Sequence, residues 1–264
     1  MLSAVYTDIG IEKKVNQDSC LLKEAVTAKG TILFAAVCDG MGGLKNGEVA
    51  SAYVVEELKK WFENDLSVLT YNGFTAEDVK KSLNRVIIMA DKKIRSYGRD
   101  NGACGTTLSG VLLAKNRYLT VNVGDSRVYR IDSDSPHQLT HDQTLAQRRV
   151  DEGEITQEEA LTDDGQNILL QCIGWGAEVV PSYTEGMYRD RSVFLLCSDG
   201  FRHRLTAEEI KNLFLPEKMD SETRMKRALR TGVETAMKRK ENDNITAIVI
   251  NTAGDCRGAL RCLK

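Results

Sequence analysis

Four strand-like segments of the sequence each carry one aspartate at an end, and this repeated arrangement constrains the fold more than any other feature. The pairs of run and aspartate are Ile32–Cys38 with Asp39, Tyr118–Val123 with Asp125, Ser192–Ser198 with Asp199, and Asp243 with Ile245–Ile250. Gly40 and further glycines follow Asp39, so the backbone there can come close to a ligand. If the four ends meet in space, they form an oxygen-rich pocket suited to a hard divalent cation.

The length and the charge of the chain limit the classes of protein to which it can belong. A chain of 264 residues with 28% charged residues is an ordinary globular protein, for which we expect a single domain. The formal net charge of −2 and the pI of about 6.0 do not indicate a nucleic-acid partner. The sequence shows no apolar run long enough for a membrane span and no signal peptide, so we expect no membrane association and a cytoplasmic location.

Alternating and helical apolar patterns predict an order of elements. We expect strands at 3–9, 19–28, 31–38, 192–198 and 245–250, helices at 48–63, 75–98 and 221–240, and a three-stranded meander at 104–114, 117–123 and 126–131. Strands and helices do not alternate regularly. The sequence therefore predicts an α+β fold with mostly antiparallel sheets packed together and helices outside.

The stretch 142–176 differs from its surroundings because it is polar and broken by glycines. We interpret it as a surface insertion, or flap, rather than as part of the sheets. No linker is evident, since the chain has only three prolines and no repeats. The expected organisation is one domain over residues 1–252 with this flap, followed by a short tail at 253–264.

The aspartates favour a particular metal chemistry. Carboxylates suit Mg²⁺ or Mn²⁺, whereas zinc calls for histidine and cysteine clusters. The pentad His137–His141 has the spacing of a zinc motif, but Gln138 replaces the glutamate that acts as its general base. Two cations about 4 Å apart activate a bridging water for direct attack on phosphorus, which removes the need for a nucleophilic side chain. Phosphate-ester hydrolysis is the natural reaction of such a site.

Seven short motifs in order carry a family resemblance. The chain resembles the bacterial form of the metal-dependent PP2C-type (PPM) serine/threonine protein phosphatases over roughly residues 3 to 250. The matching motifs are Asn16–Asp18, Val37–Gly43, Gly105–Thr107, Gly124–Arg127, Leu139–Asp142, Cys197–Phe201 and Asp243–Thr246. Each motif alone is a weak signal, but seven in order at compatible spacing are a strong one.

The resemblance implies a central β-sandwich of two antiparallel sheets, flanked by paired α-helices, with a binuclear Mn²⁺ or Mg²⁺ centre at one end. It implies that Asp39 bridges the two ions and that the carbonyl of Gly40 binds the second. Asp199 and Asp243 correspond to ligands of the first ion. Asp18 corresponds to a residue that acts through metal-bound water.

The resemblance also implies a third, weaker metal site at Asp125 and Asp199, beside which His203 stands where some relatives have an aspartate. Lys13 takes the place of an arginine that holds the substrate phosphate, and Gln17 replaces a frequent glutamate. A lysine is a point donor without the bidentate fork of arginine, so the phosphate is held less firmly.

The implied function is hydrolysis of phosphoserine and phosphothreonine on proteins, opposite a cognate serine/threonine kinase and its substrates, by a monomer. An alternative is a catalytically silent phosphoprotein-binding or regulatory module, which the departures at Lys13 and Gln17 would support. A further alternative is a sporulation- or stress-type phosphatase that acts on one dedicated partner.

Overall fold

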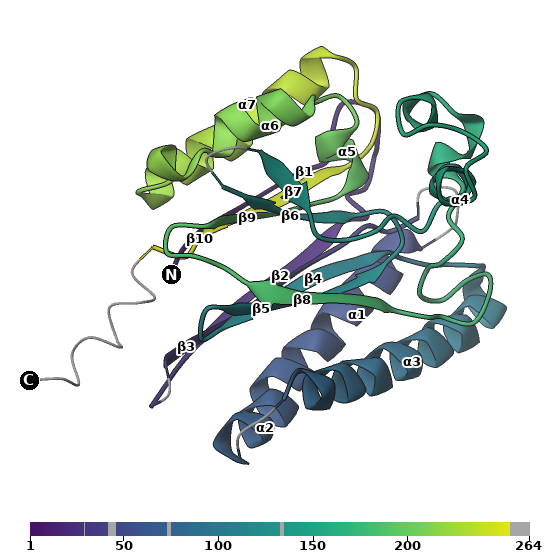
Figure 1. Cartoon of the computed structure of the whole chain (residues 1–264). Coiled ribbons are helices and arrows are strands. Elements are labelled where there is room, and N and C mark those ends of the chain that lie inside the picture. The colour runs from purple at the N-terminus through teal and green to yellow at the C-terminus, as the bar shows by residue number, and fades with distance from the viewer. Residues whose placement is uncertain (29, 42–45, 73–74, 133–134, 254–264) are drawn as a thin grey trace, which may run out of the picture.

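Two antiparallel sheets form the centre of the molecule. The computed structural model describes residues 1–28, 30–41, 46–72, 75–132 and 135–253. Within these residues, two five-stranded sheets pack face to face and helices cover both outer faces (Figure 1). The predicted α+β fold, a sandwich of two antiparallel sheets flanked by helices, is confirmed.

The first sheet joins the two ends of the described chain. Its strands are β1 (Leu2–Asp8), β6 (Arg127–Ile131), β7 (Pro136–Gln138), β9 (Val193–Cys197) and β10 (Ile245–Asn251). Their order is β1-β10-β9-β6-β7, and every neighbouring pair is antiparallel. Asp8 pairs with Ile245, so the loop after β1 lies beside the residues that precede β10.

The second sheet has the strand order β2-β3-β4-β5-β8. Its strands are β2 (Ser19–Thr27), β3 (Gly30–Cys38), β4 (Leu108–Ala114), β5 (Arg117–Val123) and β8 (Ser182–Met187). Lys115 and Asn116 form the two-residue turn between β4 and β5, and both have positive φ angles, 51° and 60°. Such left-handed turns match the twist of the paired strands and fix their register.

Helices lie on the outer face of each sheet (Figure 1). The helices over the second sheet are α1 (Gly47–Lys60), α2 (Leu66–Asn72) and α3 (Ala76–Asn101); those on the side of the first are α5 (Asp199–Arg202), α6 (Ala207–Phe214) and α7 (Glu222–Lys238). A π-helical turn, Trp61–Asp65, joins α1 to α2. The helical segment predicted to end at Glu63 therefore continues to the end of α2. The predicted capping box is present at the start of α3, between Thr75 and Asp78. None of the helices in the described part of the chain is long and apolar enough to cross a membrane.

The long apolar runs of the sequence follow from strands that are buried on both faces. Leu33, Ala35 and Val37 of β3 point into the core between the sheets, while Phe34 and the alternate residues pack against α1 and α3. A strand in the middle of a four-layer sandwich meets apolar neighbours on each side, so its sequence shows no polar alternation. The same holds for β10, whose seven residues are all buried.

The predicted meander is wrong at its third strand. β4 and β5 pair as expected, but β6 leaves the second sheet and pairs with β7 and β9 in the first. The turn at Gly124, with a φ of 97°, permits a crossing to the other sheet, and the pairing of β6 with β9 fixes it there. The place beside β5 is taken by β8, a half-exposed edge strand that the sequence patterns did not reveal.

The segment between β7 and β8 contains the predicted flap. Its helical elements are α4 (Leu145–Asp151) and two 3₁₀ turns, Glu159–Leu161 and Asp164–Asn167. Arg149 Nη1 lies 2.8 Å from Asp163 Oδ2, and this ion pair joins two parts of the flap. Isolated β-bridges from Thr144 to Leu169 and from Thr106 to Ile173 close the loop and attach it to the second sheet.

Replacement of Phe194 tests the core between the sheets. This side chain is fully buried and meets Tyr118 and Tyr188 edge to face at 5.8 and 5.6 Å. Phe194→Ala should lower the free energy of unfolding by about 3–5 kcal/mol, because it leaves a cavity that the stiff sheets cannot fill. Chemical denaturation measures the loss. Met89→Ala, at an exposed position on α3, should change it by less than about 0.5 kcal/mol. Equal losses for the two variants would contradict this packing.

Candidate metal centre

Strand ends from both sheets meet around a polar cavity of about 750 Å³ at one end of the sandwich. Asp39, Asp125, Asp199 and Asp243 all line it, and so does Lys13. The flap forms the facing wall with Leu161, Gln166, Asn167 and Leu169. The structure therefore brings together the four aspartates predicted from the strand ends, with the flap beside them.

Asp39 is fixed at the end of β3 by contacts with the start of β4. Its N–H donates to Thr107 Oγ1 at 3.0 Å, and its carbonyl accepts from the Thr107 N–H at 2.9 Å. Gly40 follows with its N–H bonded to the Gln17 carbonyl at 3.1 Å. A Cβ on Gly40 would lie 2.5 Å from that carbonyl oxygen and from the carbonyl oxygen of Gly47. Only glycine fits there, because two other backbone segments approach the site.

Asp18 lies in the interior beside these strand ends. It is 9% exposed, and its Oδ2 accepts a hydrogen bond from Ser198 Oγ at 2.9 Å. Asn16 Oδ1 accepts from the N–H of Asp18 at 3.1 Å. Asn244 holds the same loop, because its amide donates to the carbonyls of Ile9 and Val15 and accepts from the Gln17 N–H. These bonds place Asp18 against the end of β9.

Glu241, which the sequence patterns did not single out, shapes the turn that carries Asp243. It is 5% exposed, and its Oε1 accepts from the backbone N–H groups of Asn242 and Asp243 at 2.9 and 3.1 Å. Arg204 Nε lies 3.4 Å from its other oxygen. Lys240, just before, has a φ of 61°, so the chain turns sharply out of α7. Glu241 therefore positions Asp243 through the backbone.

Burial and mutual repulsion raise the pKa of several of these carboxyl groups. Burial chiefly raises the pKa of Asp18 to about 7, with Asp199 and Asp243 adding to it against hydrogen bonds that lower it. Burial and the charge of Asp18 raise the pKa of Asp39 well above its usual range. The pKa of Asp125 rises to about 7, mainly through burial and then through Asp199. Negative charge concentrated in this way favours a bound cation.

Two buried oxygen atoms support the same conclusion. Oδ1 of Asp18 and Oδ1 of Asp199 have no hydrogen-bond partner among the described residues. A buried polar atom without a partner is costly, and a carboxylate oxygen without a donor is a ready metal ligand. The donor set of carboxylates and a backbone carbonyl fits a hard cation such as Mg²⁺ or Mn²⁺.

Lys13 stands at the mouth of the cavity. Its Nζ lies 2.7 Å from Asp243 Oδ1, and the side chain is 30% exposed. Burial lowers its pKa, but the hydrogen bond and charge of Asp243, together with the charges of Asp39 and Asp199, outweigh burial and raise it. The ammonium group is therefore charged at neutral pH.

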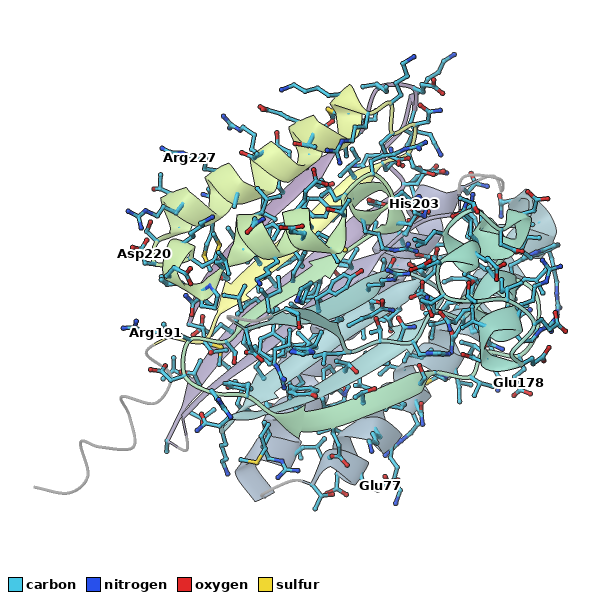
Figure 2. All side chains as sticks on the ribbon, turned by 45° about the horizontal axis from the view of Figure 1, so that its top comes forward. Glu77, Glu178, Arg191, His203, Asp220 and Arg227 are labelled. Carbon is cyan, nitrogen blue, oxygen red and sulfur yellow. The ribbon has the colours of Figure 1, made fainter. Side chains whose placement is uncertain are left out.

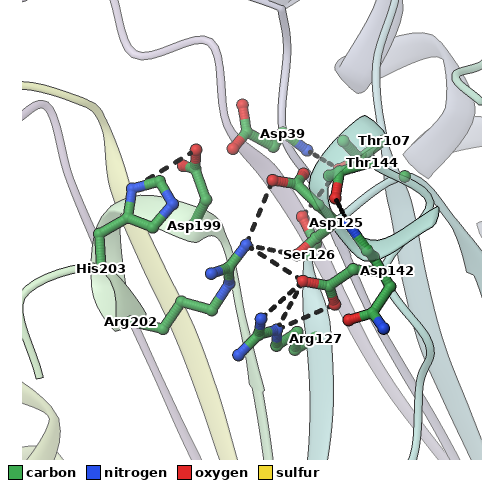
Figure 3. A network of polar contacts seen from close by, with 12 residues as sticks. Asp39, Thr107, Asp125, Ser126, Arg127, Asp142, Thr144, Asp199, Arg202 and His203 are labelled. Carbon is green, nitrogen blue, oxygen red and sulfur yellow. Dashed lines mark hydrogen bonds and ion pairs between the residues drawn. The ribbon is translucent and has the colours of Figure 1, made fainter. Parts of the chain in front are cut away.

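A network of alternating charges extends from Asp125 (Figure 3). Arg202 Nη2 donates to the carbonyl oxygen and to Oδ2 of Asp125 at 3.1 and 3.2 Å. Arg127 binds both oxygens of Asp142, at distances from 2.6 to 3.0 Å. Arg202 also lies 3.6 Å from Asp142. The sequence patterns gave no sign of Arg202.

His203 completes a compact group of possible ligands. One donor atom each from Asp125, Asp199 and His203 lie within 4.8 Å of one another. His203 lies at the end of the sandwich that faces the flap (Figure 2). Burial lowers its pKa, which favours the neutral imidazole. The zinc-like pentad contributes nothing to this group, since His141 pairs with Asp151 at 2.8 Å.

Comparison with known proteins identifies the family of the chain. The family model described as protein phosphatase 2C matches residues 11–248. Serine/threonine phosphatase stp of Listeria welshimeri serovar 6b is 32% identical over 189 residues, which cover 70% of this chain and 73% of that protein. The chain belongs to the protein phosphatase 2C family. The family predicted from the order of the motifs is confirmed.

Solved structures agree with this assignment. Stp1 from Staphylococcus aureus superposes with a TM-score of 0.82 at 29% identity, covering 96% of each chain. The catalytic domain of the phosphatase PstP, in complex with two manganese ions, gives a TM-score of 0.71 at 29% identity. That match covers 94% of this chain and 96% of the PstP domain.

Replacement of Glu241 tests whether it positions Asp243. Glu241→Ala removes the acceptor of two backbone N–H groups, which costs about 1–3 kcal/mol, so the affinity for Mn²⁺ should fall about 10-fold. Glu241→Gln keeps an oxygen acceptor and should lose less. Titration calorimetry with Mn²⁺ measures both variants, and circular dichroism checks their folding. Unchanged affinity in a folded Glu241→Ala protein would show that the turn holds Asp243 without this side chain.

Proposed function

We propose that this chain is a metal-dependent protein phosphatase that hydrolyses phosphoserine and phosphothreonine. The observation that carries the proposal is the convergence of Asp18, Asp39, Asp199 and Asp243, with two of their buried oxygens lacking a partner in the described structure. Membership of a family whose relatives are named serine/threonine phosphatases supports it.

The same residues would hold the cations. Asp39 and the carbonyl of Gly40, with Asp18, Asp199 and Asp243, form an all-oxygen donor set for two ions of Mn²⁺ or Mg²⁺. When bound, such ions neutralise phosphoryl oxygens and lower the pKa of a bound water to the neutral range. The PstP domain with two manganese ions supports the number and identity of the ions.

Protein groups complete the site around the phosphate. Lys13 presents a charged ammonium group at the mouth of the cavity. This group can donate a hydrogen bond to a phosphate oxygen, either beside its contact with Asp243 or in place of it. On the facing wall, Gln166 and Asn167 offer amide groups to a peptide, and Leu161 offers an exposed apolar side chain. The flap would therefore contact the residues that flank the phosphorylated side chain.

The alternative of a catalytically silent module is not favoured. A family member that had lost its catalytic activity would lack some of the metal-binding carboxylates, whereas this chain keeps Asp18, Asp39, Asp199 and Asp243. A sporulation- or stress-type phosphatase would share the same chemistry and differ only in its partner. We propose the broader role, in which phosphoproteins are the substrates and a cognate serine/threonine kinase with its targets is the partner system.

We also propose a domain organisation and an oligomeric state for the chain. Residues 1–252 would act as one catalytic domain, with residues 142–176 as the flap. Residues 254–264 of the predicted tail lie outside the described residues. We propose a cytoplasmic monomer, in keeping with a cavity that residues of one chain line.

Metal-dependent hydrolysis tests the function directly. With Mn²⁺, the protein should hydrolyse a phosphothreonine peptide and p-nitrophenyl phosphate, and EDTA should stop both reactions. Asp39→Asn and Asp199→Asn should each lower kcat/KM by at least about 10²-fold, because metal ions contribute several kcal/mol to the transition state. Asp220→Asn, in an exposed ion pair with Arg224 of α7, should be unchanged. Undiminished turnover in either site variant would refute the mechanism.

Lys13 offers a separate test of phosphate binding. Lys13→Ala should raise KM for the phosphopeptide about 10-fold, since it removes a charge-assisted hydrogen bond worth about 1.5–3 kcal/mol. Lys13→Arg should lower KM below the wild-type value, because a guanidinium group binds phosphate through two parallel hydrogen bonds. The exposed neighbour Lys14 provides the control, and Lys14→Ala should leave KM unchanged. Steady-state kinetics with Mn²⁺ decides between these outcomes.

A further inference from the structure

The side chain of Arg202 supplies a positive charge beside the carboxylate of Asp125. Arg202 Nη2 lies 3.2 Å from Asp125 Oδ2 and 3.1 Å from the carbonyl oxygen of the same residue (Figure 3). Both side chains are nearly buried, with 10% of Arg202 and 6% of Asp125 exposed. Salt screens a pair this buried much less than an exposed pair, so the guanidinium group stabilises the charged form of this carboxylate.

The charge of Arg202 is not needed elsewhere in the network. Asp142 is its other acidic neighbour, at 3.6 Å. Arg127 already binds both oxygens of Asp142, and Gln138 donates to Oδ1 at 2.9 Å. Arg127 and Asp142 therefore neutralise each other, which leaves Arg202 as the counter-ion of Asp125.

A third cation would have to share Asp125 with this guanidinium group. Asp125, Asp199 and His203 are close enough to act as ligands together. However, arginine stays protonated in proteins, so its charge cannot be removed to admit a metal ion. A divalent cation on Asp125 would face a fixed positive charge in contact with the same carboxylate. The contact with Arg202 therefore argues against a third ion on Asp125, which the family resemblance implied.

We propose that the guanidinium group of Arg202 takes the place of a third divalent cation on Asp125, so that the chain binds two divalent cations rather than three. This inference rests on the proposed two-ion centre. Arg202 thereby acts as a positioning residue. It joins α5, the turn between β5 and β6 and the first residues of the flap, and this connection does not depend on the concentration of metal in the medium.

Counting bound Mn²⁺ tests the proposal without any activity measurement. Equilibrium dialysis up to millimolar Mn²⁺, with free Mn²⁺ read from its electron paramagnetic resonance signal, should give two ions per wild-type chain. Arg202→Gln removes the charge and should add a third, weaker ion. Arg202→Lys keeps the charge and should bind two. The double variant Arg202→Gln with Asp125→Asn should return to two, because the freed carboxylate is then absent.

Three ions bound to the wild-type protein, or only two bound to a folded Arg202→Gln protein, would overturn the proposal. Circular dichroism establishes folding. If Arg202→Gln does not fold, Asp125→Asn decides in its place: two ions with wild-type affinities support the proposal, and a loss of one ion or of affinity refutes it. Failure of the proposed function looks different, since the wild-type protein would then bind fewer than two ions.

Discussion

Repulsion among buried carboxylates is the constraint on which the rest of this structure depends. Burial is the largest cause that raises the pKa of Asp18 and of Asp39, and the charge of Asp199 raises both further. A soft scaffold would relax by moving them apart. Here Asp39 and Asp199 are attached to the ends of β3 and β9, which are buried between apolar layers and cannot shift independently. The rigidity of the double-sided core is therefore what keeps the charges together.

Much of this architecture could be predicted because it follows from local sequence. A run such as Ile32–Cys38 is apolar on both faces only if two layers cover it, and Thr75 caps α3 through contacts within four residues. The path of β6 could not be predicted in this way. A glycine turn after β5 is compatible with a hairpin or with a crossing to the other sheet, and long-range pairing with β9 decides between them. β8 was missed because a half-exposed edge strand carries little apolar pattern.

The site shows the same division between local and long-range information. Asp39, Asp125, Asp199 and Asp243 were found because each stands at a strand end, and the structure collects all four around one cavity. Glu241 and Arg202 were not found, although they organise the backbone and charge of those aspartates. Arg202 meets Asp125 across 77 positions of sequence, and no local pattern records such a contact. Residues that act through contacts between distant parts of the chain therefore could not be predicted from local patterns.

The distribution of charge is consistent with the two-ion centre that we propose. Among the described residues, Lys13 contacts Asp243 and Arg202 contacts Asp125, while Asp18, Asp39 and Asp199 have no lysine or arginine within ion-pair distance. When bound cations keep all five carboxylates ionised, these carboxylates and the two cationic side chains sum to a charge of about −3. Two divalent cations would change it to about +1, which attracts a phosphate dianion. A third divalent cation would raise it to about +3. An arginine on Asp125 supplies the needed neutralisation without that excess.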